Sequence, residues 1–278
     1  MFQKLSDSWQ LVKASAAVLR ADKELVIFPL LSSVALVVTC AIFFAPLAFV
    51  GFSAQVSDTA HIVAYLASFF FYFVATFIMV FFNSALVGAA LIRLEGGDPT
   101  VGDGLRIARQ HLGAIFRWSL LAATVGMLLK AARERAGWLG SLVLGIIGLA
   151  WNLATFLVVP VLVTHNLGPV EALKKSASLL KKTWGEQIAG NLGLGAFFGV
   201  VGLGFTIIAV PLLFLALSTG NLWVIAPAVI VLVLGYGTIA LLSTTLSGIY
   251  SAALYRFATT GDSGYMDRRL LANAFVPK

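Results

Sequence analysis

The sequence is short of charge and of cysteine. Only 11% of its 278 residues are charged, against about 25% in a soluble domain, so polar side chains are too few to cover a water-facing surface. The single cysteine, Cys40, excludes an internal disulfide, and its place in an apolar run predicts a small core residue. With 60% hydrophobic residues and a mean hydropathy of +0.96, the chain is predicted to be an all-α polytopic membrane protein. Its apolar runs are continuous, whereas the strands of a transmembrane barrel alternate apolar and polar residues, so a barrel is excluded.

Sequence patterns typical of catalytic sites are also missing. No Asp or Glu falls in the middle of an apolar run, where an ionisable residue would mark a transport or catalytic site. The chain has no His-Glu-x-x-His, Gly-x-Ser-x-Gly or Walker pattern. Its three histidines, His61, His111 and His165, lie at separate boundary positions. We therefore expect no enzymatic activity, no cofactor and no metal site.

Long apolar runs predict six transmembrane helices, since about 20 apolar residues cross the hydrocarbon layer. The third span is the shortest, because a charged cluster follows its apolar part. The short connections predict that the six spans pair into three hairpins. The predicted spans cover residues 25–52, 61–94, 112–132, 137–163, 187–217 and 222–255.

A short amphipathic stretch precedes each predicted hairpin, at about residues 5–24, after the capping box of Thr100 and Asp103, and at Pro169–Trp184. The last is the clearest and predicts a helix lying flat on the membrane, anchored by Trp184. Its apolar residues recur at spacings of three and four, and its lysines lie opposite this stripe or on its border, where they can reach lipid phosphates. The stripe comprises Val170, Leu173, Ala177, Leu180 and Trp184.

Basic residues are distributed unequally between the two sides of the predicted topology. Of the 19 Lys and Arg residues, sixteen fall on the side of both termini and three, Lys130, Arg133 and Arg135, on the other. This asymmetry predicts that the N- and C-termini are both cytoplasmic. The net charge of +7 favours anionic lipid as the partner over nucleic acid in a chain this apolar.

A short sequence recurs at two predicted span ends. Residues 89–94 read Ala-Ala-Leu-Ile-Arg-Leu and residues 252–257 read Ala-Ala-Leu-Tyr-Arg-Phe. A weaker similarity relates residues 11–15 to residues 173–177. These matches suggest three copies of a unit made of a surface helix and two spans, at residues 1–94, 95–164 and 165–261, followed by a polar tail at 262–278. Chance similarity between apolar and basic segments is the alternative explanation.

The leading functional hypothesis is that the basic residues on the predicted cytoplasmic side contact anionic headgroups or a partner protein. The alternative is that they act in topology alone. The candidate contact residues are Lys174, Lys175, Lys181, Lys182, Trp184, Lys13, Arg20, Arg106 and Arg109. A second hypothesis is a small-molecule or lipid transporter or channel with a polar path past Asn83, Asn152 and Asn191. Hydrogen bonds between helices are the simpler explanation of these asparagines.

Four segments resemble an uncharacterised family of prokaryotic six-span membrane proteins, known only as a domain of unknown function. They are Arg20-Ala-Asp-Lys-Glu24, Ala123-Thr-Val-Gly126, Leu149-Ala-Trp-Asn152 before Val159-Pro-Val161, and the run from Lys175 to Glu186 that ends in Trp-Gly-Glu. The resemblance covers most of the chain and implies location in the plasma (inner) membrane of a prokaryote, without an activity. Where the family often has an acidic residue, this sequence has Thr164 and His165. The plan of surface helices and hairpins is also distantly similar to membrane domains attached to some glycerophosphodiester phosphodiesterases.

Overall fold

The computed structural model describes residues 13–50, 58–184 and 193–261, and contains no strand within these ranges. It confirms an all-α membrane protein with six helices long and apolar enough to cross a bilayer. Five spans are continuous helices: α2 (Ile27–Val50), α3 (Asp58–Leu94), α5 (Leu112–Arg135), α9 (Gly193–Ser218) and α10 (Leu222–Thr260). The fourth consists of α6 (Trp138–Thr155) and α7 (Val158–Thr164).

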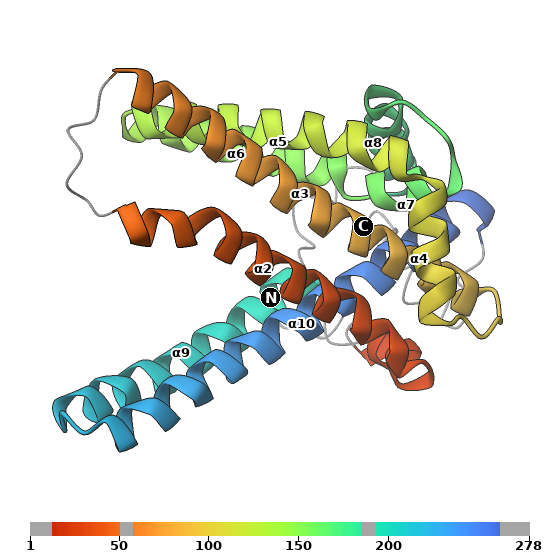
Figure 1. Ribbon diagram of the computed structural model, residues 1–278. Coiled ribbons are helices and arrows are strands. Elements are labelled where there is room, and N and C mark those ends of the chain that lie inside the picture. The colour runs from red at the N-terminus through yellow and green to blue at the C-terminus, as the bar shows by residue number, and fades with distance from the viewer. Residues whose placement is uncertain (1–12, 51–57, 185–192, 262–278) are drawn as a thin grey trace.

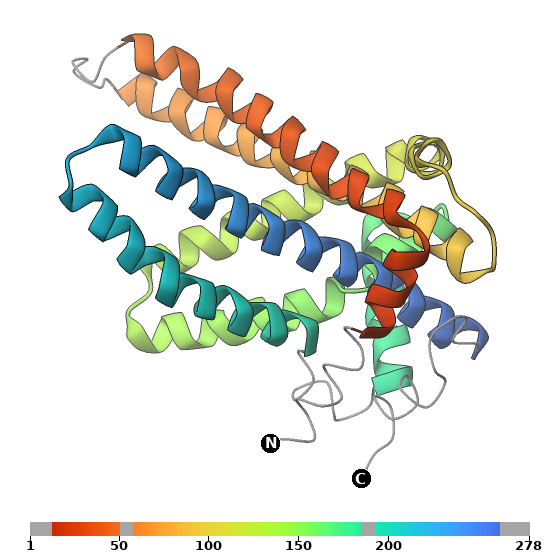
Figure 2. The same ribbon diagram turned by 90° about the horizontal axis from the view of Figure 1, so that it is seen from below.

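The long helices diverge from one end of the molecule (Figures 1 and 2). α2 packs on α3, α5 on α6 and α9 on α10, and each pair extends away from the same region. α3 is the central helix, because it contacts α2, α4 (Val101–Gln110), α5, α7 and α10. We call the region where the helices meet the packed end; it comprises residues 84–94 of α3, 157–163 and 245–255 of α10.

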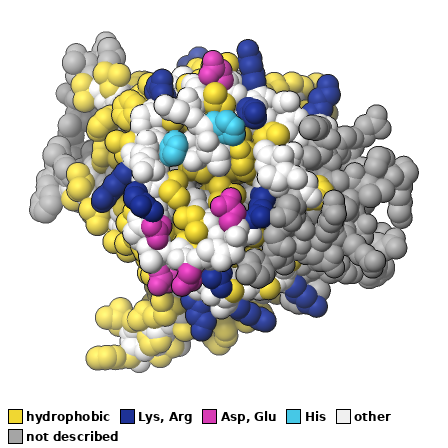
Figure 3. Space-filling model, turned by 90° about the vertical axis from the view of Figure 1, so that its right-hand side faces the viewer, with side chains coloured by type: hydrophobic (Ala, Val, Ile, Leu, Met, Phe, Trp, Pro, Cys, Tyr) yellow, Lys and Arg dark blue, Asp and Glu magenta, His cyan; other side chains and the backbone are white. Residues whose placement is uncertain are grey.

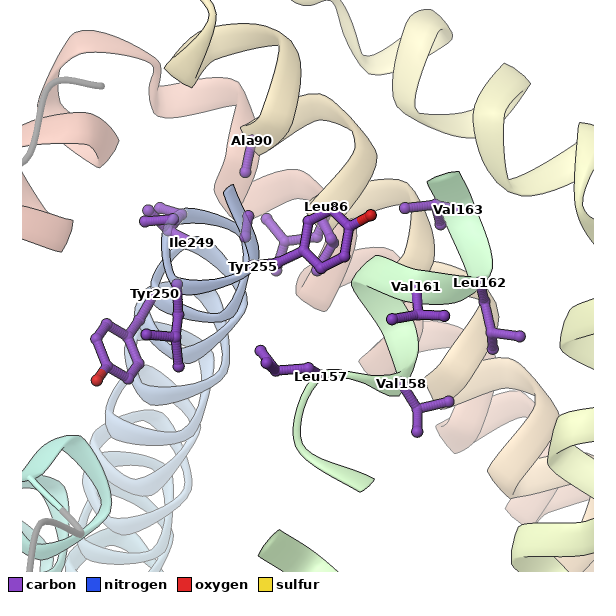
Figure 4. Packing of buried hydrophobic residues seen from close by; sticks show 14 of the residues in the cluster. Leu86, Ala90, Leu157, Val158, Val161, Leu162, Val163, Ile249, Tyr250 and Tyr255 are labelled. Carbon is purple, nitrogen blue, oxygen red and sulfur yellow. The ribbon is translucent and has the colours of Figure 1, made fainter. Parts of the chain in front are cut away.

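The hydrophobic core lies at the packed end (Figure 4). Small residues in the repeated sequence, such as Ala90 in α3 and Ala253 in α10, are fully buried and allow the two helices to approach closely. Leu86 and Ile249 fill the space beside them, and Leu157 approaches from the α6–α7 junction. Close packing of this kind fixes the helices relative to one another at this end.

Away from the packed end, apolar side chains are exposed. In the most apolar stretch of α10 no residue is buried, and Ile207 of α9 and Val231 of α10 are 72% and 62% exposed. A surface this apolar requires hydrocarbon around it. Cys40 of α2 is among the exposed residues, so the prediction of a core cysteine is wrong.

Four glycines of the fifth span do not mediate close packing between helices. At Gly195, Gly199, Gly202 and Gly204 a β-carbon would meet no neighbouring atom. The close approach of α9 to α10 instead uses a glycine of the partner helix, because the ring of Phe205 lies directly over Gly235.

The fourth span breaks between Thr155 and Val158. Pro160 has no N–H and cannot continue the hydrogen-bond ladder of a helix through this point. The backbone N–H of Leu157 donates instead to the Ser176 Oγ of α8 (Pro169–Trp184), at 3.1 Å. Since both residues are buried, this hydrogen bond satisfies a group that water cannot reach.

Three short helices lie at the packed end: residues 13–21, α4 and α8 (Figure 1). The predicted capping box at the start of α4 is confirmed, since Thr100 Oγ1 accepts from the N–H of Asp103 and the Asp103 carboxylate accepts from the N–H of Thr100. The break at His111 then separates α4 from α5. Each short helix is followed by two long ones, the arrangement on which the predicted division into three units rests; that division stays a prediction. Of the predicted N-terminal stripe, residues before 13 lie outside the described residues.

Candidate functional site at the packed end

Exposed basic side chains gather at the surface of the packed end. Figure 3 looks onto this end and shows Lys and Arg side chains spread around its edge, with acidic and histidine side chains between them. They come from three short helices that are distant in the sequence. Seven of the predicted contact residues are exposed: Lys13, Arg20, Arg106, Arg109, Lys174, Lys175 and Lys181. The side chains of Lys182 and Trp184, including the predicted anchor, lie outside the described residues.

α8 presents a different face to its surroundings from the one predicted. Ala172, Ser176, Leu179 and Leu180 are buried against the protein, whereas Val170 is 52% exposed. Among the stripe residues whose side chains the structure describes, Leu180 is the one in the core; Leu173 and Ala177 are half-buried. α8 contacts α6, α7 and α10, so protein packing holds it in place. Its lysines therefore project from a fixed support.

Carboxylates at the packed end are engaged in local contacts. Asp103 receives hydrogen bonds from the backbone and side chain of Thr100, which lower the pKa of its carboxyl, and it pairs with Arg106 at 2.6 Å. Arg93 pairs with Asp98 at 3.2 Å, and Glu24 accepts from the backbone N–H of Val101. Within the described ranges, the exposed lysines of α8 form no such ion pair, so their charge faces the surroundings.

Asp22 is the exception among these acids. It caps the 3-10 turn Lys23–Val26 by accepting from the backbone N–H of Glu24, but its second oxygen is buried without a hydrogen-bond partner in the described chain. Burial raises the pKa of this carboxyl above its ordinary value, and the nearby Arg93 opposes the rise.

A hydrogen-bonded cluster that the sequence did not predict joins α7 to α10. The hydroxyl of Thr164 bonds that of Tyr255 at 2.8 Å and lies 2.9 Å from Nδ1 of His165. Thr164 Oγ1 also donates to the carbonyl of Pro160, which ties the cluster to the backbone of α7. Thr164 and Tyr255 are 91 residues apart, so no local signal could have predicted their contact.

The three asparagines of the alternative hypothesis are not brought together by the described residues. Asn83 lines a cavity of about 280 Å³ between α2, α3 and α10, together with the hydroxyl residues Ser32, Ser33 and Thr244. Asn152 is exposed on α6 and does not line this cavity. Asn191 lies outside the described residues.

Metal-binding side chains do not converge in the part of the chain that the structure describes, where no three His, Cys, Asp or Glu residues form a group suited to a metal ion. His111 Nδ1 lies 3.0 Å from the Ile107 carbonyl, an ordinary helix-end contact, and His165 belongs to the cluster above.

Together, the six apolar helices and the packed end with its basic surface define a polytopic α-helical membrane protein. Residues 62–265 match the model of a protein family described as "Family of unknown function (DUF6159)". The match spans most of the chain, and the protein belongs to this family. Neither the curated proteins nor the solved structures contain a significant match to it.

Proposed function

We propose that this protein is a non-enzymatic multi-pass protein of a prokaryotic plasma membrane that binds anionic lipid headgroups through the basic surface of its packed end. One observation carries the proposal: exposed Lys and Arg residues from three separate short helices gather on the same face. Each basic residue near an anionic leaflet contributes roughly 1 kcal/mol, so a cluster on a rigid support favours such lipids over zwitterionic ones. A partner protein with an acidic surface is the competing occupant.

The orientation proposed here places the packed end in the cytoplasm. The helix at residues 13–21 and the C-terminal end of α10 both lie at this end, together with α4 and α8 (Figure 1). The Lys130, Arg133 and Arg135 cluster lies at the opposite end of α5. An excess of basic residues in cytoplasmic segments is the general rule for membrane proteins.

Cysteine labelling tests this orientation. In a variant with Cys40 replaced by alanine, Ser178→Cys on the exposed side of α8 is expected to react with a membrane-impermeant maleimide only from the cytoplasmic side. Thr219→Cys, in the turn between α9 and α10, is the matched control and is expected to react only from outside. The reverse pattern would contradict the proposed topology.

Lipid retention tests the headgroup interaction. Changing Lys174, Lys175, Lys181 and Lys182 together to Gln is expected to lower the co-purifying anionic lipid by about tenfold or more, because up to about 4 kcal/mol of attraction is removed before entropic costs. Insertion is expected to remain, since the six spans determine it. Native mass spectrometry from mixed-lipid membranes measures the retained lipid.

The matched control changes the same four lysines to Arg, which preserves the charge and is expected to preserve retention. Unchanged anionic lipid in the Gln variant would show that the lysines act only in topology, and the headgroup proposal would then be withdrawn.

A small-molecule path is the second candidate, and the cavity beside Asn83 favours it. Asn83 lies ten residues from Arg93, about 15 Å along α3 from the cytoplasmic end of this helix and so inside the membrane. Four polar side chains at this depth suit a small uncharged solute. In the same labelling series, reaction of Asn83→Cys with the impermeant reagent would favour a water-filled path, and protection would argue against one.

A further inference from the structure

We propose a second lipid site at the end opposite to the packed end. In this site one acyl chain of an anionic phospholipid lies between α2, α3 and α5, and its phosphate group binds Lys130. The site shares no residue with the basic surface of the packed end and stands independently of the function proposed above.

A cavity of about 520 Å³ forms the acyl-chain site. Its volume falls within the range of about 300–1,000 Å³ that small-molecule sites occupy. Phe43 and Phe44 from α2 and Phe71 from α3 form one wall, in which the rings of Phe44 and Phe71 contact edge to face at 5.2 Å. Met127 of α5 also lines the cavity. An aromatic and thioether lining suits a flexible hydrocarbon chain.

Gly126 brings α5 close to the cavity wall. A β-carbon at this position would overlap the hydroxyl and ring of Tyr72, so only glycine allows the tyrosine ring to lie against α5. From Ala64 to Tyr72 the lining follows α3 for eight residues, about 12 Å along the helix. An acyl chain can therefore extend from the outer end toward the middle of the bilayer.

Lys130 supplies the charge for the headgroup. It lines the cavity, and its side chain is 77% exposed. Glu134 lies 3.9 Å away and is 65% exposed, and an exposed pair of this kind contributes little. Arg133 and Arg135 are exposed on the next turn of α5, so the cluster carries a net positive charge. A phosphate group can balance the positive charge of this cluster that Glu134 leaves.

A groove of similar size between α9 and α10 provides an internal comparison. Its volume is about 530 Å³, but its lining, which includes Leu212, Leu213 and Val231, contains no charged residue. Hydrocarbon fills such a groove regardless of the headgroup. The cavity beside Lys130 differs by its cation, so of these two cavities it is the one expected to distinguish anionic from zwitterionic lipid.

The test uses photoactivatable lipids in nanodiscs that contain the full-length protein. Phosphatidylglycerol and phosphatidylcholine, each with a diazirine at the middle of one acyl chain, are crosslinked separately, and the adducts are mapped by peptide mass spectrometry. We expect labelling of Phe71, Tyr72 or Met127, normalised to labelling of Leu212 and Leu213, to be about fivefold higher for phosphatidylglycerol. Fivefold corresponds to about 1 kcal/mol for one interfacial cation.

Two variants decide the assignment. Lys130→Gln is expected to remove the fivefold preference but not the labelling itself, while Lys130→Arg retains both. The normalisation to the α9–α10 groove within each sample corrects for any loss of folded protein.

Three results would overturn the proposal. One is equal labelling by the two lipids in the unmodified protein. The second is a preference that survives in Lys130→Gln. The third is stronger labelling by a diazirine fatty acid than by phosphatidylglycerol, which would assign the cavity to a free carboxylate.

Discussion

Replacing Leu180 by Asp is expected to destabilise the protein by about 4 kcal/mol or more. Leu180 is 3% exposed and belongs to the core against which α8 packs. The substitution removes a buried leucine, which alone contributes about 2–5 kcal/mol, and places a carboxylate where no partner is available. The melting temperature in a mild detergent, measured by the loss of the monodisperse species, reports the change.

Val170→Asp is the matched control for this prediction. Val170 lies on the same helix and belongs to the stripe that the sequence predicts, but it is 52% exposed. A charge at this position is expected to change the melting temperature by only a small amount, because the carboxylate remains solvated. Equal destabilisation by the two substitutions would mean that α8 buries the predicted stripe and not the observed face.

Replacing Gly104 by Ala is expected to destabilise the protein by about 1–3 kcal/mol, although alanine favours helices over glycine by up to about 1 kcal/mol. α4 crosses α3 so closely that a β-carbon at residue 104 would lie 2.7 Å from the backbone carbonyl oxygen of Ala85 and would also overlap the ring of Phe28. A backbone carbonyl cannot rotate away as a side chain can, so α4 must move outward.

Gly102→Ala on the same helix provides the opposite expectation. A β-carbon at this position would meet only the Thr100 hydroxyl, at 3.5 Å. The substitution is expected to raise stability by up to about 1 kcal/mol, because it limits the unfolded chain and improves helix propensity. Thermal unfolding of the two variants measures whether each substitution raises or lowers stability. Destabilisation by both would contradict the close contact of α4 with α3.

Helix boundaries in two elements agree with the prediction from the sequence, whereas the break in the fourth span does not. The bounds of α8, Pro169–Trp184, and the start of α5 at Leu112 agree with the prediction, because capping residues and apolar periodicity are local signals. The break in the fourth span was not predicted, although Pro160 was visible, because membrane helices often tolerate proline. Only the contact between Ser176 and Leu157 shows how the broken ladder is satisfied.

The sequence predicted which basic residues lie at one end of the molecule but not which face of α8 is buried. That the cations of α4 and α8 lie at one end follows from counting charges between spans, since alternate loops of a polytopic chain lie on the same side. Whether Val170 or Leu179 of α8 faces the protein depends on the neighbouring helices. Apolar residues occur on both the buried and the exposed face of α8, so its sequence does not distinguish the two faces. The same limit applies to Asn83 and Asn152, which the sequence grouped and the structure separates.

The sequence by itself determined the six spans, the three short helices that each precede two spans, and the uneven distribution of charge. These features depend on the length of apolar runs and on residues three or four positions apart, which act within a single helix. The tertiary structure alone decided where the core forms, which face of α8 is buried, and how Thr164 meets Tyr255. It also decided that Lys130 borders an aromatic cavity. Such contacts join residues far apart in the chain, and their free energy depends on shapes that exist only after the helices have packed.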